Sequence, residues 1–307
     1  MRLTPSPEQA AFAASVHDLL SADPGAAIPA LAEVGVTGLM VPERWGGLGG
    51  TTADLVVVAE ELGHHAVPGP LAESVAAAPA LLAGIGGGLA EKWLPELAAG
   101  RVIATLAAPP WLPLAPDVES AGLVLLAEED SVRIGRPGPA YPSIDPARRL
   151  TDIGRGSVLA EGPEAAAAVR DAIDAGALAC AAQLLGAGRA LLETTIGYAR
   201  ERTQFGRPIG SFQAVQHRLA DVAVGLEFAR PLLHAAAVTG SSRDVSAAKV
   251  ACGAAAHLAG RAALQVHGAI GYTQEYGLGR WLTRVQVLRN AWGTAARHRA
   301  RVMEEAP

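Results

Sequence analysis

Apolar residues recur at alternating intervals of four and three between residues 211 and 238. They are Val215, Leu219, Val222, Leu226, Ala229 and Leu233. This spacing puts them on one face of an α-helix, so it predicts a helix packed along its whole length against others. An Ala-rich run before it, from about Glu164 to Arg202, predicts another long helix whose small side chains allow neighbouring helices to approach closely.

The same periodicity predicts two further helical segments, about 245–266 and 277–305. Four long helices with mostly short connections pack best as an antiparallel bundle, which we expect over residues 161–307. Residues 1–100 also have helical spacing. Ser6 before Pro7 is a helix start, Thr51 or Thr52 caps a later helix, and residues 35–42 are expected to form an extended link.

Between residues 101 and 160 the pattern changes to short β-type segments, at about 102–106, 122–126 and 131–134, separated by Pro-rich and acidic turns. The sequence therefore predicts a mainly α protein with a small β domain. We expect an N-terminal helical domain (1–100), a reduced β domain (101–160) and a C-terminal four-helix bundle (161–307).

Composition narrows the functional class of this chain of 307 residues. The net charge of −5 argues against a nucleic-acid binder, and 50% hydrophobic with 18% charged residues indicates a globular protein. Cys180 and Cys252 lie in Ala-rich helical sequence, which predicts buried free thiols. No signal peptide opens the chain, and Pro79 interrupts the most apolar run, so we expect a cytoplasmic protein without a membrane partner.

Candidate chemistry gathers where the first two bundle helices are joined. Arg202, Gln204 and Phe205 flank a break whose shape Gly206 and Pro208 fix. A cation and an aromatic ring on a rigid corner suit a flat, anionic ligand. The alternative is a helical hairpin whose polar residues face water, and such hairpins are common.

Several motifs in this order resemble the acyl-CoA dehydrogenase family. The C-terminal ones are Glu201-Arg-Thr-Gln-Phe-Gly-Arg-Pro-Ile209, Phe212-Gln-Ala-Val-Gln216, Leu219-Ala-Asp221, Ala248-Lys249, Gln265-x-x-Gly268 and Gly271-Tyr-Thr-Gln-Glu-Tyr276. The N-terminal ones are Val41-Pro-Glu-Arg-Trp-Gly-Gly-Leu-Gly49 and Trp93-Leu-Pro-x-Leu97-Ala-x-Gly100. The resemblance covers both helical parts and implies an α–β–α architecture, bound FAD and α,β-dehydrogenation of an acyl thioester by a tetramer.

The resemblance also implies which residues contact FAD. In the family the Arg-x-x-Phe corner lies against the FAD of a neighbouring subunit, which carries over to Arg202, Gln204 and Phe205, with Phe212 nearby. Guanidinium pairs with phosphate in a fork, and a ring covers a flat heterocycle. Gln265 and Gly268 match a family Gln-x-x-Gly-Gly segment near the same FAD. Here Ala269 replaces the second Gly.

The catalytic base of the family has no counterpart. Dehydrogenation needs a carboxylate that removes the α-proton. By spacing, Trp292 stands where most family members have the catalytic Glu, and Gly176 stands at the other known base position. Asp174, two residues away, points to another side of its helix and is expected to be solvated, with a displaced base as the alternative. We therefore expect no catalytic residue in this chain.

Other candidates carry less weight. The family's flavin-holding stretch of the middle domain is replaced by Leu106-Ala-Ala-Pro-Pro-Trp-Leu-Pro113, where Trp111 is expected to be packed or at a rim rather than facing a flavin. His64 and His65 lack a carboxylate or Cys partner at ligand spacing, so a surface or capping role is expected and no metal site. The last helices are basic because they carry six arginines: Arg280, Arg284, Arg289, Arg297, Arg299 and Arg301. These arginines are expected to form a solvated face, to make salt bridges between subunits, or to contact phosphate.

Together these features predict a non-catalytic subunit of an α2β2 FAD-dependent acyl-CoA dehydrogenase. A longer catalytic partner would supply the base and share its FAD with this chain. An α2β2 dehydrogenase with one shortened subunit that lacks the base resembles the steroid side-chain-degrading enzymes of actinobacteria. This resemblance implies that the substrate is a steroid-CoA thioester, bound mainly by the partner. The alternatives are a self-sufficient homomeric flavoenzyme with a displaced base and a flavin-free structural member of the fold.

Overall fold

The computed structural model describes residues 3–23, 28–273 and 276–304. Its N-terminal helices are α1 (Pro7–Ala22), α2 (Ile28–Glu33), α3 (Thr52–His64), α4 (Ala78–Ile85), which a π-helical turn (Ala72–Ala77) precedes, and α5 (Gly87–Ala98). Ser6 and Thr51 each accept a hydrogen bond from the backbone N–H three residues on, and both form capping boxes. Both predicted helix starts are confirmed.

The predicted extended link at residues 35–42 is wrong, because this segment forms consecutive turns. Leu39 N–H donates to Val36 O, and Val41 N–H donates to Gly38 O. Val36, Leu39 and Val41 are all at most 2% exposed. In an extended strand, successive side chains point to opposite faces, so Val36 would point away from Leu39 and Val41. Consecutive turns can bury all three side chains.

The β part is one five-stranded sheet of order β1-β3-β4-β5-β2. Its strands are β1 (Ala104–Ala107), β2 (Ala115–Pro116), β3 (Leu123–Ala127), β4 (Ser131–Pro142) and β5 (Arg149–Glu161). β1 and β3 are parallel, and every other pair is antiparallel, with Leu125 opposite Ile134 and Tyr141 opposite Leu150. β5 was not predicted and β4 is longer than predicted, because their outer halves are polar, Gly-containing and exposed.

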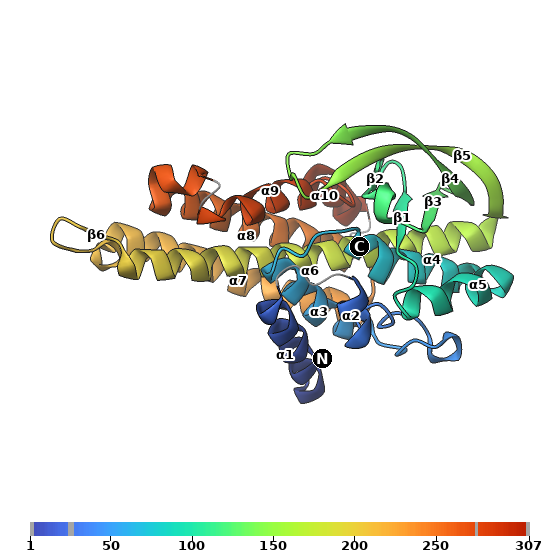
Figure 1. Ribbon diagram of the computed structural model, residues 1–307, viewed down its shortest axis with the longest axis horizontal. Helices are drawn as coiled ribbons and strands as arrows, with labels where there is room; N and C mark the ends of the chain where they lie inside the picture. The colour runs from blue at the N-terminus through green and yellow to red at the C-terminus, as the bar shows by residue number, and fades with distance from the viewer. Residues whose placement is uncertain (1–2, 24–27, 274–275, 305–307) are drawn as a thin grey trace.

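The bundle consists of α6 (Pro163–Glu201), α7 (Gln213–Thr239), α8 (Ser242–His267), α9 (Gly279–Leu288) and α10 (Ala295–Glu304). These helices follow the predicted segments within a few residues. Figure 1 shows α6, α7 and α8 side by side along the long axis. The sheet lies at one end, and the hairpin that contains β6 (Thr203–Gln204) lies at the other. The structure thus confirms a mainly α fold with a small β part.

Two glycines let α3 cross α6 at close range. A Cβ on Gly63 would lie 2.0 Å from the carbonyl oxygen of Gln183, and one on Gly186 would lie 1.8 Å from that of Glu60. No side chain fits at either position, so the small residues predicted for α6 are required at this crossing. One apolar core runs from the N-terminal helices through the sheet into the bundle.

Two helices, α6 and α7, are long and apolar enough to cross a membrane by length and composition alone. The apolar window of α6 is 83% buried within the protein, as in the core helix of a globular fold, whereas that of α7 is 39% buried. Length and composition are weak indications, so they carry no membrane assignment here.

Candidate functional site

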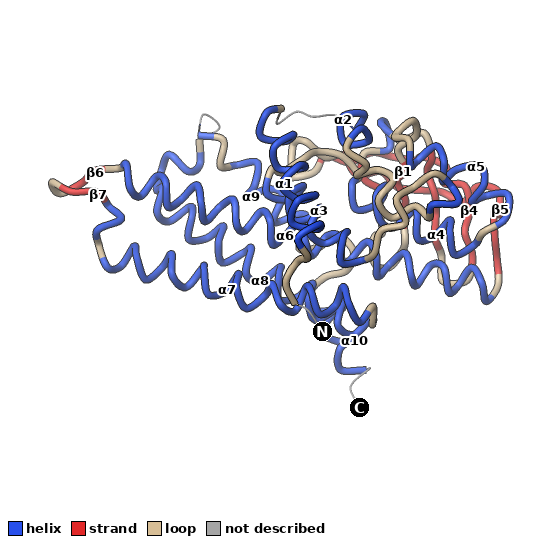
Figure 2. Tube along the Cα trace, turned by 90° about the horizontal axis from the view of Figure 1, so that it is seen from below, coloured by secondary structure: helices blue, strands red, loops and turns tan. Residues whose placement is uncertain are grey.

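The corner between α6 and α7 is a β-hairpin that projects from the end of the bundle (Figure 2). Strands β6 (Thr203–Gln204) and β7 (Arg207–Pro208) pair antiparallel, with Gln204 opposite Arg207. Phe205 and Gly206 form the two-residue loop with φ of 53° and 77°, the pattern of a type I′ turn. Left-handed backbone at Phe205 is uncommon for a residue with a side chain, so this turn fixes where the ring projects.

The side chains of this corner are open to solvent. Phe205 is 92% exposed, and Arg202 and Gln204 are exposed as well. Among the described residues, no hydrogen bond or ion pair involves the guanidinium of Arg202, and the Gln204 amide donates only to its neighbour's carbonyl. A rigid turn that presents an unpaired cation and a bare ring is unusual for a purely structural connection.

Phe212 is half-buried behind the hairpin. Its ring meets that of Phe205 edge to face at a centroid distance of 6.1 Å, and the guanidinium of Arg207 lies 4.1 Å over the ring of Phe212. Arg207 was not among the predicted site residues, although it stands within the same motif. The corner therefore carries two arginines and two rings.

Gln265 and Gly268 lie in an adjoining open groove of about 870 Å³, between the first turns of α7 and the end of α8. Among the described residues, its polar lining includes Arg218, Arg261 and His217, against the one carboxylate of Asp221. Cationic groups prevail, so the groove suits an anion. The sequence did not reveal Arg218 and Arg261, because they come from two helices and only the packing of α7 against α8 brings them together.

Gly268 has a φ of +64°, and a Cβ there would meet no atom within 4 Å. The described chain therefore leaves room for a side chain at position 268. Because the residue is glycine, the backbone beside the groove is exposed. The adjacent Ala269 also lines the groove. The corner and the groove together fit a flat ligand with phosphate groups, such as FAD: guanidinium groups for phosphate and exposed rings for a heterocycle.

A second location is closed. Trp292 is fully buried, and a Cβ on Gly176 would lie 2.6 Å from its indole ring. The two positions where the sequence comparison places a base are thus neighbours, and one indole fills the space between them. The cavity beside Trp292 is about 10 Å³, which is the space of about one water molecule and far too small for an acyl chain.

A buried carboxylate lies beside this indole. Trp292 Nε1 donates to Glu73 Oε1 at 2.9 Å, and Arg148 lies 3.7 Å from the same oxygen. Burial raises the pKa of Glu73, although Arg148 and the indole N–H act to lower it. Glu73 was not predicted as a site residue, because it stands in an apolar helical run. With its nearer partner an indole N–H and no space around it, this carboxylate has no access to a substrate.

Asp174 is not the solvated residue expected from the sequence. It is half-buried, bound by Arg301 at 2.6 Å and by the hydroxyl of Ser242. Position 174 faces α8 and α10, so packing supplies it with partners that the helical wheel alone did not show. Both oxygens of this carboxylate are thus already bound, by a guanidinium and a hydroxyl. Trp111 is packed at a rim as expected, near His298, Arg297 and Arg301.

The basic character of the last helices has several origins. Arg284 is 6% exposed and donates to Asp145 at 2.6 Å, so the expectation of a solvated face is wrong for it. Arg289 donates to Gln286. The remaining three are exposed in the described structure: Arg280, Arg297 and Arg299. Cys180 and Cys252 are free and buried, as predicted.

The expectation that His64 and His65 lack carboxylate partners is wrong. His64 Nε2 lies 2.8 Å from Glu193, and both histidines lie close to Glu61 and to His17. His17 lies on α1 and Glu193 on α6, and both are distant in sequence from His64 and His65. Glu61 precedes His64 by one helical turn and was the signal that could have revealed the cluster.

Comparisons with known proteins identify the fold and the family. The model of the acyl-CoA dehydrogenase N-terminal domain matches residues 6–101, and that of the C-terminal domain matches residues 166–306. Acyl-CoA dehydrogenase IpdE2 of Mycolicibacterium smegmatis is 35% identical over 281 residues, covering 91% of this chain and 86% of that protein.

Solved structures share the fold. A glutaryl-coenzyme A dehydrogenase in complex with glutaryl-CoA superposes with a TM-score of 0.86 at 21% identity, over 99% of this chain and 96% of the other. A variant of the Tcur3481-Tcur3483 steroid ACAD superposes with a TM-score of 0.80 at 24% identity, over 97% and 96% of the two chains. The two family models together cover most of the sequence, and the IpdE2 match covers 91% of it. On these grounds the chain belongs to the acyl-CoA dehydrogenase family.

Proposed function

We propose that this chain is the non-catalytic subunit of an α2β2 heterotetrameric, FAD-dependent acyl-CoA dehydrogenase. The observation that carries the proposal is the indole of Trp292, which fills the space at both base positions and leaves no room for an acyl chain. A longer partner subunit supplies the carboxylate that removes the α-proton. FAD, when bound, supplies the hydride acceptor.

The role of this chain is to hold the cofactor at the subunit interface. Arg202 pairs with phosphate, Gln204 hydrogen-bonds beside it, and Phe205 with Phe212 covers the flat part of the ligand. Gln265 and Gly268 border the same ligand from the groove. The support is that Arg202, Phe205 and Gln265 are exposed in the described chain, where no hydrogen bond or ion pair involves the Arg202 guanidinium.

The proposed substrate is a bulky steroid side-chain CoA thioester, bound mainly by the partner, and the complex is placed in the cytoplasm. The support is the similarity in fold to a steroid ACAD whose name joins two gene products. A panel of acyl-CoA thioesters offered to the purified complex tests this point. We expect a higher kcat/KM for a steroid side-chain thioester than for butyryl-CoA, and the reverse order would refute the substrate class.

The subunit role is tested by expressing the chain alone and together with a full-length acyl-CoA dehydrogenase that retains its base. Alone, we expect a colourless protein with no dye reduction. The complex should bind about one FAD per heterodimer and oxidise acyl-CoA. Stoichiometric FAD and turnover by the chain alone would establish the homomeric alternative, and a partnered complex without flavin would establish a structural role.

Arg202→Ala tests the corner within that complex. We expect it to lower the flavin content at least tenfold under dilute conditions, since a charge-assisted bond to phosphate is worth about 1.5–3 kcal/mol. The matched control is Arg243→Ala, another exposed arginine, at the start of α8 and far along the bundle from the groove. Equal flavin content in the two variants would refute the role of the corner.

A further inference from the structure

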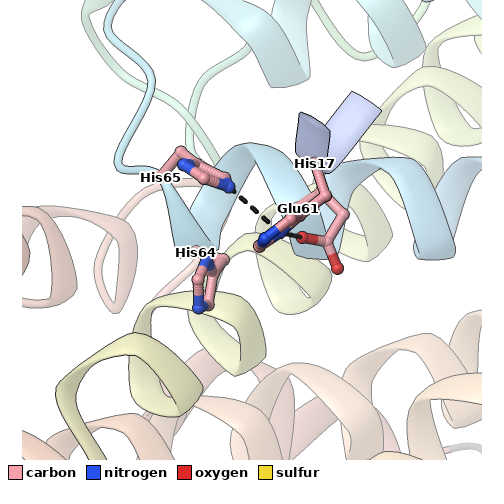
Figure 3. A group of neighbouring side chains, drawn as sticks. All are labelled: His17, Glu61, His64 and His65. Atoms are coloured by element: carbon pink, nitrogen blue, oxygen red, sulfur yellow. Dashed lines mark hydrogen bonds and ion pairs between the residues drawn. The ribbon is translucent and has the colours of Figure 1, made fainter. Parts of the chain in front are cut away.

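Four side chains with metal-ligating atoms converge where α1 crosses the end of α3. His17 comes from α1, Glu61 and His64 from the last turn of α3, and His65 follows as its C-cap. One ligand atom from each lies within 4.8 Å of those of the other three. Figure 3 shows the side chains of His17, Glu61 and His65 turned toward one another, with His64 beside them.

Two of the distances already approach those of a tetrahedral site. His65 Nε2 lies 3.2 Å from His17 Nδ1, and His17 Nδ1 lies 2.9 Å from Glu61 Oε2. With zinc bonds of about 2.0–2.1 Å, neighbouring donor atoms of a tetrahedron lie about 3.3 Å apart. These two distances are thus within about 0.4 Å of the tetrahedral spacing, and the other donor pairs lie within 4.8 Å.

His64 is oriented as a metal-binding histidine commonly is. Its Nε2 lies 2.8 Å from Glu193 Oε2, so the proton sits on Nε2 and is donated to that carboxylate. Its Nδ1 is buried and has no hydrogen-bond partner among the described residues. A ligating histidine usually donates its other N–H to a carboxylate or carbonyl, which fixes the lone pair on the metal. In His64 the carboxylate partner of Nε2 is Glu193, and the lone pair of Nδ1 accepts no hydrogen bond from the described residues.

Arg189 also donates to both oxygens of Glu61, at 2.7 and 2.9 Å, so a cation must share this carboxylate with a guanidinium. The surrounding charges allow it, because Glu60, Glu61 and Glu193 face Arg189 and Arg230. Arg189 can keep Oε1 while Oε2 ligates, which is the hydrogen-bonded arrangement that ligating carboxylates commonly have.

We propose that His17, Glu61, His64 and His65 bind one zinc ion. Four protein ligands close a tetrahedral site, so the ion is structural and fastens α1 to α3. This connection matters for α1, in which only Val16 and Leu20 are buried. Three nitrogen donors favour zinc over magnesium or calcium, which take oxygen ligands.

The test uses the tag-free full-length chain, co-purified with its partner if it needs one, stripped with a chelator and dialysed. Zinc titration followed by calorimetry and metal analysis should give one zinc per chain with a Kd below about 1 μM, a level ordinary for multidentate protein sites. His17→Gln and His65→Gln should each weaken binding at least tenfold. His257→Gln on α8, which has no carboxylate partner in the described structure, is the matched control and should bind like the parent.

A second measurement separates lost ligands from lost folding. Zinc should slow hydrogen exchange of the α1 amides in the parent and in His257→Gln, and leave it unchanged in His17→Gln. All four metal-free proteins should have the same circular dichroism. Binding of less than 0.1 zinc per parent chain, or parent-like zinc affinity in both His17→Gln and His65→Gln, overturns the proposal.

Discussion

The indole of Trp292 occupies the space into which a Cβ at Gly176 would project, with 2.6 Å between the two positions. Trp292 has a left-handed φ of 55°, and its N–H is bound to Glu73. The ring is thus fixed at both its backbone and its polar end. A side chain larger than glycine at position 176 would therefore collide with the ring.

Gly176→Ala is therefore expected to destabilise the protein by about 1–3 kcal/mol, the usual cost of overpacking a buried site. Urea unfolding of the purified chain or complex measures it. The matched control is Gly197→Ala on the same helix, where a Cβ would meet no atom within 4 Å. It should stabilise the protein by about 0.5–1 kcal/mol, because alanine favours a helix over glycine. Effects of the same sign at both positions would contradict this packing.

His298 should make stability depend on pH. It is buried between the Ser246 hydroxyl, 3.0 Å from Nδ1, and the Trp292 carbonyl, 2.8 Å from Nε2, and burial lowers its pKa to about 4. Between pH 6.5 and 4 the unfolded chain takes up this proton and the folded chain does not. The free energy of unfolding should therefore fall with decreasing pH, by up to about 1.4 kcal/mol per pH unit.

Denaturant unfolding at several pH values, compared with His298→Gln, isolates this contribution. Between pH 4 and 6.5 the free energy of unfolding of the variant should depend less steeply on pH, by up to about 1.4 kcal/mol per pH unit, whatever its stability at pH 7. Parallel curves for the two proteins would contradict the lowered pKa, because they would show that His298 takes up its proton equally in the folded and unfolded chains.

The buried pair of Arg284 and Asp145 connects α9 to the loop between β4 and β5. Arg284 also donates to the carbonyl of Val67. Arg284→Met should cost about 3–5 kcal/mol, because it leaves a buried carboxylate without its partner. The double variant Asp145→Leu with Arg284→Met should recover part of that loss. A double-mutant cycle in urea measures the coupling, and additive effects would mean that the two charges do not interact.

Phe205 offers a test that separates ligand contact from folding. Its ring is 92% exposed, so Phe205→Ala should change the free energy of unfolding by less than about 0.5 kcal/mol. In the complex it should lower the affinity for FAD, because a ring that covers a flat ligand is lost. Ile144→Ala, at a residue 65% exposed on the β4–β5 loop, is the control for both measurements. Unchanged flavin affinity in Phe205→Ala would argue against the proposed contact.

Local sequence was enough to predict the helices and to group the residues of the corner. The spacing of Leu226 and Leu233 defines α7, because one buried face of a helix needs that period. Ser6 and Thr51 begin helices because their side chains satisfy backbone N–H groups nearby. Arg202, Gln204 and Phe205 lie within four residues of one another, so local spacing was enough to group them.

Contacts between elements that are distant along the chain became apparent only in the folded protein. Gly176 and Trp292 are far apart in sequence, as are Asp174 and Arg301, His17 and Glu61, and Arg218 and Arg261. β5 also escaped prediction, since its exposed polar face carries no alternating pattern. Local periodicity shows which face of a helix is buried, whereas the neighbour that buries it depends on how all the faces pack at once. In this chain that packing placed the Trp292 indole against Gly176 and left Arg202 and Phe205 exposed.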